Sequence, residues 1–282
     1  QRLKDISPEV ITVVGGPSID DIDDELQLLL LNHPEYDVCI PGEGEVGLLK
    51  LIEHLNNQKP ISSNSPIPGC ATLADDRSLM KGVYERPNMN DISSPYLDGT
   101  LDAFLEDGYE PMIQSMRGCP YACTFCVSGT TNWHKVRAFN PEQVFAEFEY
   151  IKANSTNKNL ILVDENFGIL KEHDVAFAKH IRKSFDESSY PQQFYTYTAK
   201  IVTEHVKEVA LLLSPLMKLN MSFQTLNSQV IKNIQRTNMK FDRFIETLSW
   251  ARKNGVTTTT EMIFGFPGET LDSYLNGLET LI

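Results

Sequence analysis

The sequence lacks a long hydrophobic run and is short of basic residues. Its densest apolar stretch, LQLLLLN at 26–32, is far shorter than the roughly 20 residues that a membrane-spanning helix needs. Lysine and arginine number 25 against 38 aspartates and glutamates, so the formal net charge is −13. This balance argues against a general phosphate-binding surface. We therefore expect neither a membrane span nor a nucleic-acid partner.

Cysteine is scarce, and its odd count excludes a fully paired set of disulfides. Three of the five cysteines lie within eight residues, in RGCPYACTFC at 117–126, with the spacing C-x3-C-x2-C. That spacing is poor for a disulfide framework and good for metal ligation, which fits a reducing, cytoplasmic location. No secretory signal opens the sequence. The first residue is Gln and the last ones form an amphipathic pattern, so we expect an excerpt of a longer protein.

The first part of the chain alternates as an open α/β sheet does. The strand-like runs at 10–16 and 36–40 are each followed by an amphipathic helix pattern. Two such units in a row are typical of a doubly wound domain, of which we expect the C-terminal half at 1–58. From 59 to 110, asparagine, serine, proline and glycine dominate, which indicates a small hairpin and an extended linker.

From Pro111 onward, strand-like runs again alternate with helix patterns. The five runs lie at 111–116, 159–163, 194–198, 218–223 and 256–264. Right-handed crossovers curl such a series toward a barrel, in which the chemistry lies at the C-terminal ends of the strands. We therefore expect a partial barrel at 111–282, with the cysteine loop directly after its first strand.

The three clustered cysteines suit an iron–sulfur cluster. Cys119, Cys123 and Cys126 can each give it a thiolate, and three ligands for four irons leave one iron open to a substrate. Structural zinc prefers paired C-x2-C knuckles that make four ligands, so a zinc loop or a chance cluster is the alternative. The other cysteines, Cys39 and Cys70, are interpreted as small buried apolar residues. We predict a 4Fe-4S cluster at the loop.

RGCPYACTFC, with the aromatic Phe125 before the last cysteine, resembles the radical S-adenosylmethionine (SAM) superfamily. It is similar to the branch with an N-terminal cobalamin-binding domain. The resemblance implies a cobalamin-binding-like half domain followed by a partial (βα)6 radical SAM barrel, whose open iron holds the amino and carboxylate groups of SAM. It also implies an external electron donor, such as flavodoxin or ferredoxin, and reductive cleavage of SAM to a deoxyadenosyl radical.

The same resemblance implies SAM-binding residues at the strand ends. In VDENFG at 163–168 the family commonly holds groups that bind the SAM amino group, and the structural alternative is an exposed turn with a helix cap. Lys200 matches a place for a cation near the SAM carboxylate. Gln224 would contact SAM or substrate, and the segment 260–270 would flank the adenine. The implied residues are Phe125, Asp164, Glu165, Asn166, Lys200, Gln224, Glu261, Ile263 and Gly265.

The glycine-rich strand ends of the first part resemble the cobalamin-binding domain of this branch. Gly15 and Gly16 would let the nucleotide tail of cobalamin lie close to the sheet, and Gly42, Glu43 and Gly44 would form a turn at the cofactor edge. The string Asp-x-His-x-x-Gly, which often ligates cobalt from below, is absent from this sequence and leaves the axial ligand open.

Together these features imply a cobalamin-dependent radical SAM methyltransferase acting on a small-molecule, natural-product or lipid-type substrate. Methylthiolation, cyclisation or rearrangement is the alternative within the family, since a fold does not fix a reaction. A non-catalytic iron–sulfur electron carrier is the alternative of another class, although it would need a fourth ligand. A third hypothesis is an N-terminal domain that has lost cobalamin and serves only for interaction.

Overall fold

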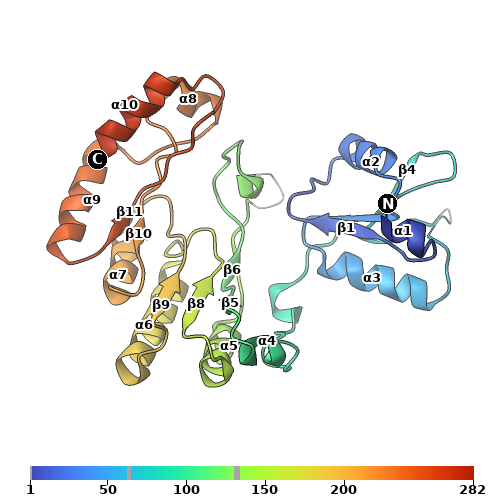
Figure 1. The fold of residues 1–282 in the computed structure, drawn as a ribbon, viewed down its shortest axis with the longest axis horizontal. Coiled ribbons are helices and arrows are strands. Elements are labelled where there is room, and N and C mark those ends of the chain that lie inside the picture. Colours follow the sequence, from blue (N-terminus) through green and yellow to red (C-terminus); the bar gives the residue numbers. More distant parts are fainter. Residues whose placement is uncertain (1, 62–64, 130–133) are drawn as a thin grey trace. The chain divides into compact units, whose positions relative to one another are not determined.

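The chain divides into two units in a computed structural model that describes residues 2–61, 65–129 and 134–282 (Figure 1). The units are Gln1–Ile92 and Ser93–Ile282. This division differs from the limits at 58 and 110 suggested by composition. Residues 71–81 form a hairpin that is hydrogen bonded to the N-terminal sheet, so they belong with that sheet rather than with a linker.

The first unit is a four-stranded mixed sheet in the order β1-β2-β3-β4. β1 and β2 pair in parallel through a crossover helix, and β3 and β4 add the antiparallel hairpin. The parallel pair joined by a helix confirms the predicted doubly wound half domain. Its elements are α1 (Arg2–Ile6), β1 (Val13–Gly16), α2 (Asp23–Asn32), β2 (Val38–Pro41), α3 (Glu45–Asn56), β3 (Ala71–Leu73), β4 (Leu79–Lys81) and the 3-10 turn η1 (Met89–Asp91).

The core of this unit follows the alternation of side chains along β2. Val38 and Ile40 pack with Leu51 of α3, whereas Cys39 packs with Leu26 and other residues of α2. Successive strand residues point to opposite faces, so α2 and α3 cover the two faces of the sheet (Figure 1).

Cys39 and Cys70 are 0% and 1% exposed, which confirms their interpretation as buried apolar residues. Burial raises the pKa of each thiol to about 11. Each of the two packs among apolar residues in the core of this unit.

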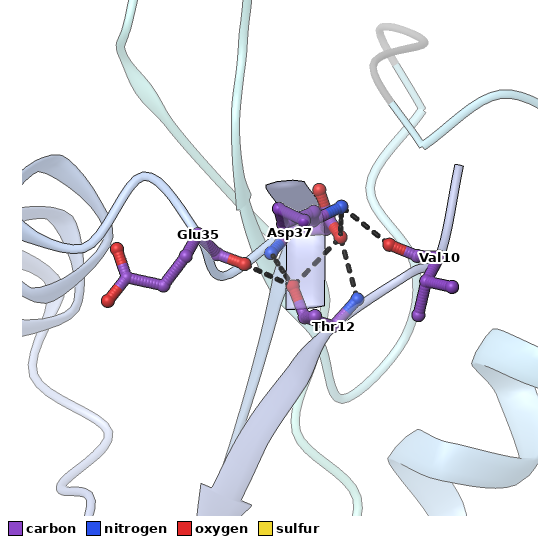
Figure 2. A network of polar contacts seen from close by, with 5 residues as sticks. Val10, Thr12, Glu35 and Asp37 are labelled. Carbon is purple, nitrogen blue, oxygen red and sulfur yellow. Dashed lines mark hydrogen bonds and ion pairs between the residues drawn. The ribbon is translucent and has the colours of Figure 1, made fainter. Parts of the chain in front are cut away.

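A polar network ties the segment before β1 to the turn before β2 (Figure 2). The Asp37 carboxylate accepts hydrogen bonds from the Lys4 ammonium and from the backbone and hydroxyl of Thr12. Lys4 also donates to the Val10 carbonyl, and the Thr12 hydroxyl donates to the Glu35 carbonyl. Burial opposes the charge of Asp37, but its hydrogen bonds outweigh burial and hold its pKa below the ordinary value.

We expect Asp37→Asn to lower the free energy of unfolding by about 1–2 kcal/mol at pH 7, because charge-assisted hydrogen bonds are lost. A depressed pKa in the folded state gives stability that is present above the unfolded pKa, near 3.9, and is lost as the pH falls through the folded pKa. The difference between wild type and variant should thus shrink below about pH 4. Denaturant titrations at pH 7 and pH 3.5 measure it, and a difference that stays constant would contradict this account.

The second unit begins with a short helix and continues as five strand–helix repeats. Its elements are α4 (Asp102–Glu106), β5 (Met112–Ile113), β6 (Met116–Arg117), η2 (Val127–Gly129), β7 (Arg137–Ala138), α5 (Pro141–Asn154), β8 (Asn159–Leu162), α6 (Lys171–Ser188), β9 (Gln193–Tyr195), α7 (Glu204–Leu212), β10 (Leu219–Asn220), α8 (Ser228–Asn233), α9 (Phe241–Lys253), β11 (Thr258–Thr259) and α10 (Leu271–Leu281).

The parallel strands of this unit follow one another in sequence order (Figure 1). β5, β8 and β9 form one sheet, and β10 pairs in parallel with β11. The Thr198 hydroxyl bridges these two groups, since it donates to the carbonyl of Asn220 and accepts from its amide. This series is the predicted partial barrel.

Hydrophobic residues on the helices bury the outer side of this strand series. Phe148 of α5 and Phe177 of α6 pack edge to face, and Phe167 joins them beyond the end of β8. A second cluster packs Val206 and Ala210 of α7 against residues around β10 and α9. The strands are thus packed from outside, which positions the side chains that follow their ends. Among the described helices, none is both long and apolar enough to cross a bilayer.

Candidate functional site

The cysteine loop is closed at its base by a short antiparallel ladder. Met116 and Arg117 of β6 pair with Ala138 and Arg137 of β7. Within the loop, the Cys126 amide donates to the Cys123 carbonyl at 3.1 Å. Gly129 packs against the backbone of Cys123 so closely that a Cβ there would collide with its carbonyl oxygen. The loop is therefore a compact turn that carries all three cysteines.

The cysteines lie at one cavity of about 340 Å³ within the second unit. Cys123 is 6% exposed, Cys119 is half-buried, and Cys126 is exposed. Burial raises the pKa of the Cys119 thiol. No three His, Cys, Asp or Glu side chains among the described residues are arranged to hold a single metal ion. The thiolates of an iron–sulfur cluster bind separate irons and need not converge on one point.

Polar groups from outside the cysteine loop reach two of the sulfurs. The Asn166 amide nitrogen is 3.2 Å from Cys119 Sγ. Arg236 Nη1 and Lys200 Nζ are 3.7 and 4.0 Å from Cys123 Sγ. Burial lowers the pKa of Lys200, while its electrostatic interaction with Cys123 opposes this shift. The loop is therefore in direct contact with the segments that follow β8, β9 and α8.

Two buried acceptor atoms in the cavity lining have no hydrogen-bond partner. Glu165 accepts from the Ser128 hydroxyl with Oε1, at 3.1 Å, whereas its Oε2 is buried and unpaired. Gln224 Oε1 is also buried and unpaired. The Gln224 backbone has φ +66°, a left-handed conformation that costs a non-glycine residue free energy. An unpaired buried acceptor is costly, so both atoms fit a ligand that brings hydrogen-bond donors.

Comparison with known proteins shows the family of this chain. Residues 113–281 match the model of the radical SAM superfamily. The chain belongs to the radical SAM superfamily. It is 28% identical to the cobalamin-dependent radical SAM methyltransferase TokK of Streptomyces tokunonensis, over 99% of this chain and 42% of TokK.

Solved radical SAM structures have the same fold. The chain matches TsrM from Kitasatospora setae, solved with cobalamin and a [4Fe-4S] cluster bound, at 14% identity with a TM-score of 0.70. It matches OxsB, solved with aqua-cobalamin and SAM bound, at 17% identity with a TM-score of 0.68. These matches cover 97% and 96% of this chain, but 53% and 39% of TsrM and OxsB. The chain thus spans about half the length of its relatives or less.

Most residues proposed for SAM from the sequence line the cavity of this radical SAM domain. They are Phe125, Glu165, Asn166, Lys200, Gln224 and Glu261. The Phe125 ring lies 4.9 Å from that of Phe266, and Glu261 accepts from the Ser222 hydroxyl at 2.9 Å.

Three of the proposed residues are not in the cavity lining. Asp164 is 1% exposed and turned toward the strand that precedes the cysteine loop. Its carboxylate accepts from the amides of Ser115 and Met116, at 2.8 and 3.1 Å, and from the Ser115 hydroxyl. Burial raises its pKa to about 7 against these hydrogen bonds. Ile263 and Gly265 follow the bridge between Gln224 and Met262.

The radical SAM cavity also has lining residues that the sequence did not single out for it. Arg236 follows α8, and Tyr121 lies inside the cysteine string. The others are Ser128, Gly129, Tyr197, Thr198, Asn220 and Ser222. The sequence gives little sign of a role for the small residues among them, since small polar residues are common at strand ends. Alternation along the segment 220–224 selects three of its lining residues.

The glycines proposed for cobalamin differ in what surrounds them. Gly16, at the end of β1, has φ +104° and open space where a Cβ would be. A Cβ on Gly15 would instead collide with the Ile40 carbonyl. Gly42 lies against the Tyr84 hydroxyl, which accepts from the Glu43 amide at 3.1 Å, and Gly44 precedes the first turn of α3. Of these four glycines, Gly16 is the one with no other atom within 4 Å of where a Cβ would be.

Proposed function

We propose that the full-length protein is a cobalamin-dependent radical SAM methyltransferase. The observation that carries the proposal is one cavity lined by three cysteines of a single loop and by two buried acceptors without partners. The cysteines suit a cluster with one open iron. The acceptors suit a ligand with donor groups, as SAM has in its amino group and ribose hydroxyls.

Different residues of the cavity would hold the cluster and SAM. Cys119, Cys123 and Cys126 would ligate the cluster. Glu165 and Gln224 would accept hydrogen bonds from SAM, and Lys200 would neutralise its carboxylate. When bound, the cluster and SAM supply a deoxyadenosyl radical that takes a hydrogen atom from the substrate, and cobalamin supplies the methyl group.

Support for cobalamin comes from the first unit and from the relatives. TokK is described as cobalamin-dependent and matches 99% of this chain, the first unit included. TsrM and OxsB were solved with cobalamin bound and match nearly all of it. Gly16 would admit the cofactor at the end of β1, where open α/β sheets bind ligands. We assign cobalamin binding to the first unit, and binding of the cluster and SAM to the second.

Methyl transfer is preferred over methylthiolation, cyclisation and rearrangement because the relatives that match the whole chain include named methyltransferases. We propose a small-molecule substrate of natural-product or lipid type, a cytoplasmic location, and a flavodoxin or ferredoxin as electron donor. A non-catalytic electron carrier would have no use for the two unpaired acceptors beside the cysteines.

The test is anaerobic purification of the full-length protein with iron, sulfide and cobalamin supplied, followed by incubation with SAM and a reductant. We expect an iron–sulfur absorption band, bound cobalamin, and release of deoxyadenosine and methionine. Deoxyadenosine without bound cobalamin would overturn the methyltransferase proposal and keep radical SAM chemistry. A protein that binds iron but releases no deoxyadenosine would favour the electron carrier.

A further inference from the structure

The three cysteines do not have equivalent surroundings. Cys123 Sγ has two cations beside it, Arg236 at 3.7 Å and Lys200 at 4.0 Å. Cys119 Sγ faces the neutral amide of Asn166. Cys126 is exposed, and in the described ranges no side-chain donor reaches its sulfur. The positive charge is thus concentrated on one ligand position.

Arg236 is held in place by contacts that do not involve the cysteine. Its Nη2 donates to the Ser222 carbonyl at 2.6 Å, and its Nε donates to Asn238 Oδ1 at 2.7 Å. Asn238 in turn donates to the Thr225 carbonyl at 2.8 Å. The guanidinium is therefore fixed to the end of the fourth strand, with Nη1 left to face Cys123. Arginine stays protonated at all ordinary pH values, so this charge is permanent.

Lys200 is held by an aromatic ring, whereas Arg236 is held by hydrogen bonds. Its ammonium lies 4.1 Å from the ring centroid of Tyr121, within the range of a cation–π contact. Tyr121 belongs to the cysteine loop itself, so the loop and the cation are positioned together. Two cations, one in the segment after β9 and one just after α8, therefore meet at the same sulfur.

Charge at a cluster ligand changes the free energy of adding an electron. Reduction makes a thiolate-ligated cluster more negative, and a fixed cation nearby favours the reduced state. The cavity is partly shielded from water, which weakens screening of these charges. Hydrogen bonds and charge around the ligand sulfurs are established determinants of cluster potentials.

We propose that Arg236, together with Lys200, is a positioning residue that raises the reduction potential of the cluster through Cys123. The proposal rests on the proposed function, since it requires the cluster. The step is a one-electron transfer from a low-potential carrier of the flavodoxin or ferredoxin class, in which the carrier is oxidised and the cluster reduced. The pair would bring the cluster within reach of such a donor before SAM binds.

The experiment is an anaerobic redox titration of the reconstituted full-length protein, followed by electron paramagnetic resonance, without SAM. For Arg236→Gln we expect the one-electron reduction equilibrium constant to fall about tenfold, which is about 59 mV toward more negative potential. Arg236→Lys keeps the charge and should stay near wild type. Arg252→Gln removes an equal charge from an exposed position in the last turn of α9 and should leave the potential unchanged.

Iron and sulfide contents separate the two proposals. A wild-type protein without a cluster would overturn the proposed function. Wild type and Arg236→Gln with equal clusters and equal potentials would overturn the present inference alone. If Arg236→Gln does not hold a cluster, Lys200→Met decides in the same titration, because a lowered potential supports the inference and an unchanged one overturns it.

Discussion

Replacing any one of Cys119, Cys123 and Cys126 by alanine is expected to abolish the iron–sulfur cluster of the anaerobically reconstituted protein. All three side chains line the same cavity, and a cluster with one open iron has no ligand to spare. We expect loss of the broad iron–sulfur absorption in the visible range, loss of most bound iron, and no release of deoxyadenosine from SAM. Absorption spectra, iron and sulfide assays and product analysis measure these three quantities on each variant.

The chain offers matched controls in its two other cysteines. Cys39 and Cys70 are buried among apolar residues in the core of the first unit, so alanine there should leave iron content and absorption unchanged. Full cluster content in any of the three loop variants would contradict the ligand assignment. Loss of the cluster in Cys39→Ala or Cys70→Ala, in a protein that still folds, would do the same.

Asp164→Ala should cause the largest loss of stability that we expect from a single polar residue. It leaves two amides and a hydroxyl of Ser115 and Met116 without their acceptor in a buried place. Orphaned buried donors cost about 1–3 kcal/mol each, so we expect the free energy of unfolding to fall by about 3 kcal/mol or more. These donors come directly before the cysteine loop, so cluster content should fall as well. Denaturant unfolding and iron assays measure the two effects.

Asp164→Asn is the matched control, since its amide keeps an acceptor oxygen for the backbone. The folded pKa of Asp164 is raised to about 7, so the folded state binds the proton more tightly than the unfolded state. The stability that this group gives is full below its unfolded pKa, near 3.9, and is lost as the pH rises through about 7. Asp164→Asn should not show this decline. The free energy of unfolding is measured against pH for both proteins. If it changes with pH in the same way for wild type and Asp164→Asn between pH 4 and pH 8, this account is contradicted.

The order of elements and the place of the cysteine loop were accessible to sequence reasoning. The spacing of the cysteines and the strand just before them depend on neighbouring residues, which local patterns report well. The hairpin at 71–81 was partly missed because its strands have three residues each, too few for a clear alternation. Its membership of the first sheet depends on pairing with β2, a contact between distant residues.

Individual side chains at the site were harder to predict. Asp164, Glu165 and Asn166 are consecutive acidic or amide residues, and only the twist at the end of β8 decides which of them face the cavity. Arg236 reaches Cys123 because Gln235 adopts a left-handed backbone, φ +48°, just after α8. No residue-type preference predicts that conformation for glutamine.

The cysteine loop is also bonded to α8, since the Thr124 amide donates to the Ile234 carbonyl at 3.2 Å. Ile234 is buried with Val230 and Phe266, and Phe266 lies against the Phe125 ring of the loop. Backbone and aromatic contacts therefore couple α8 directly to the middle of the cysteine loop. Second mutations that compensate for a damaging substitution in the cysteine loop should then lie on the buried face of α8, rather than on the strands that carry the other cavity residues.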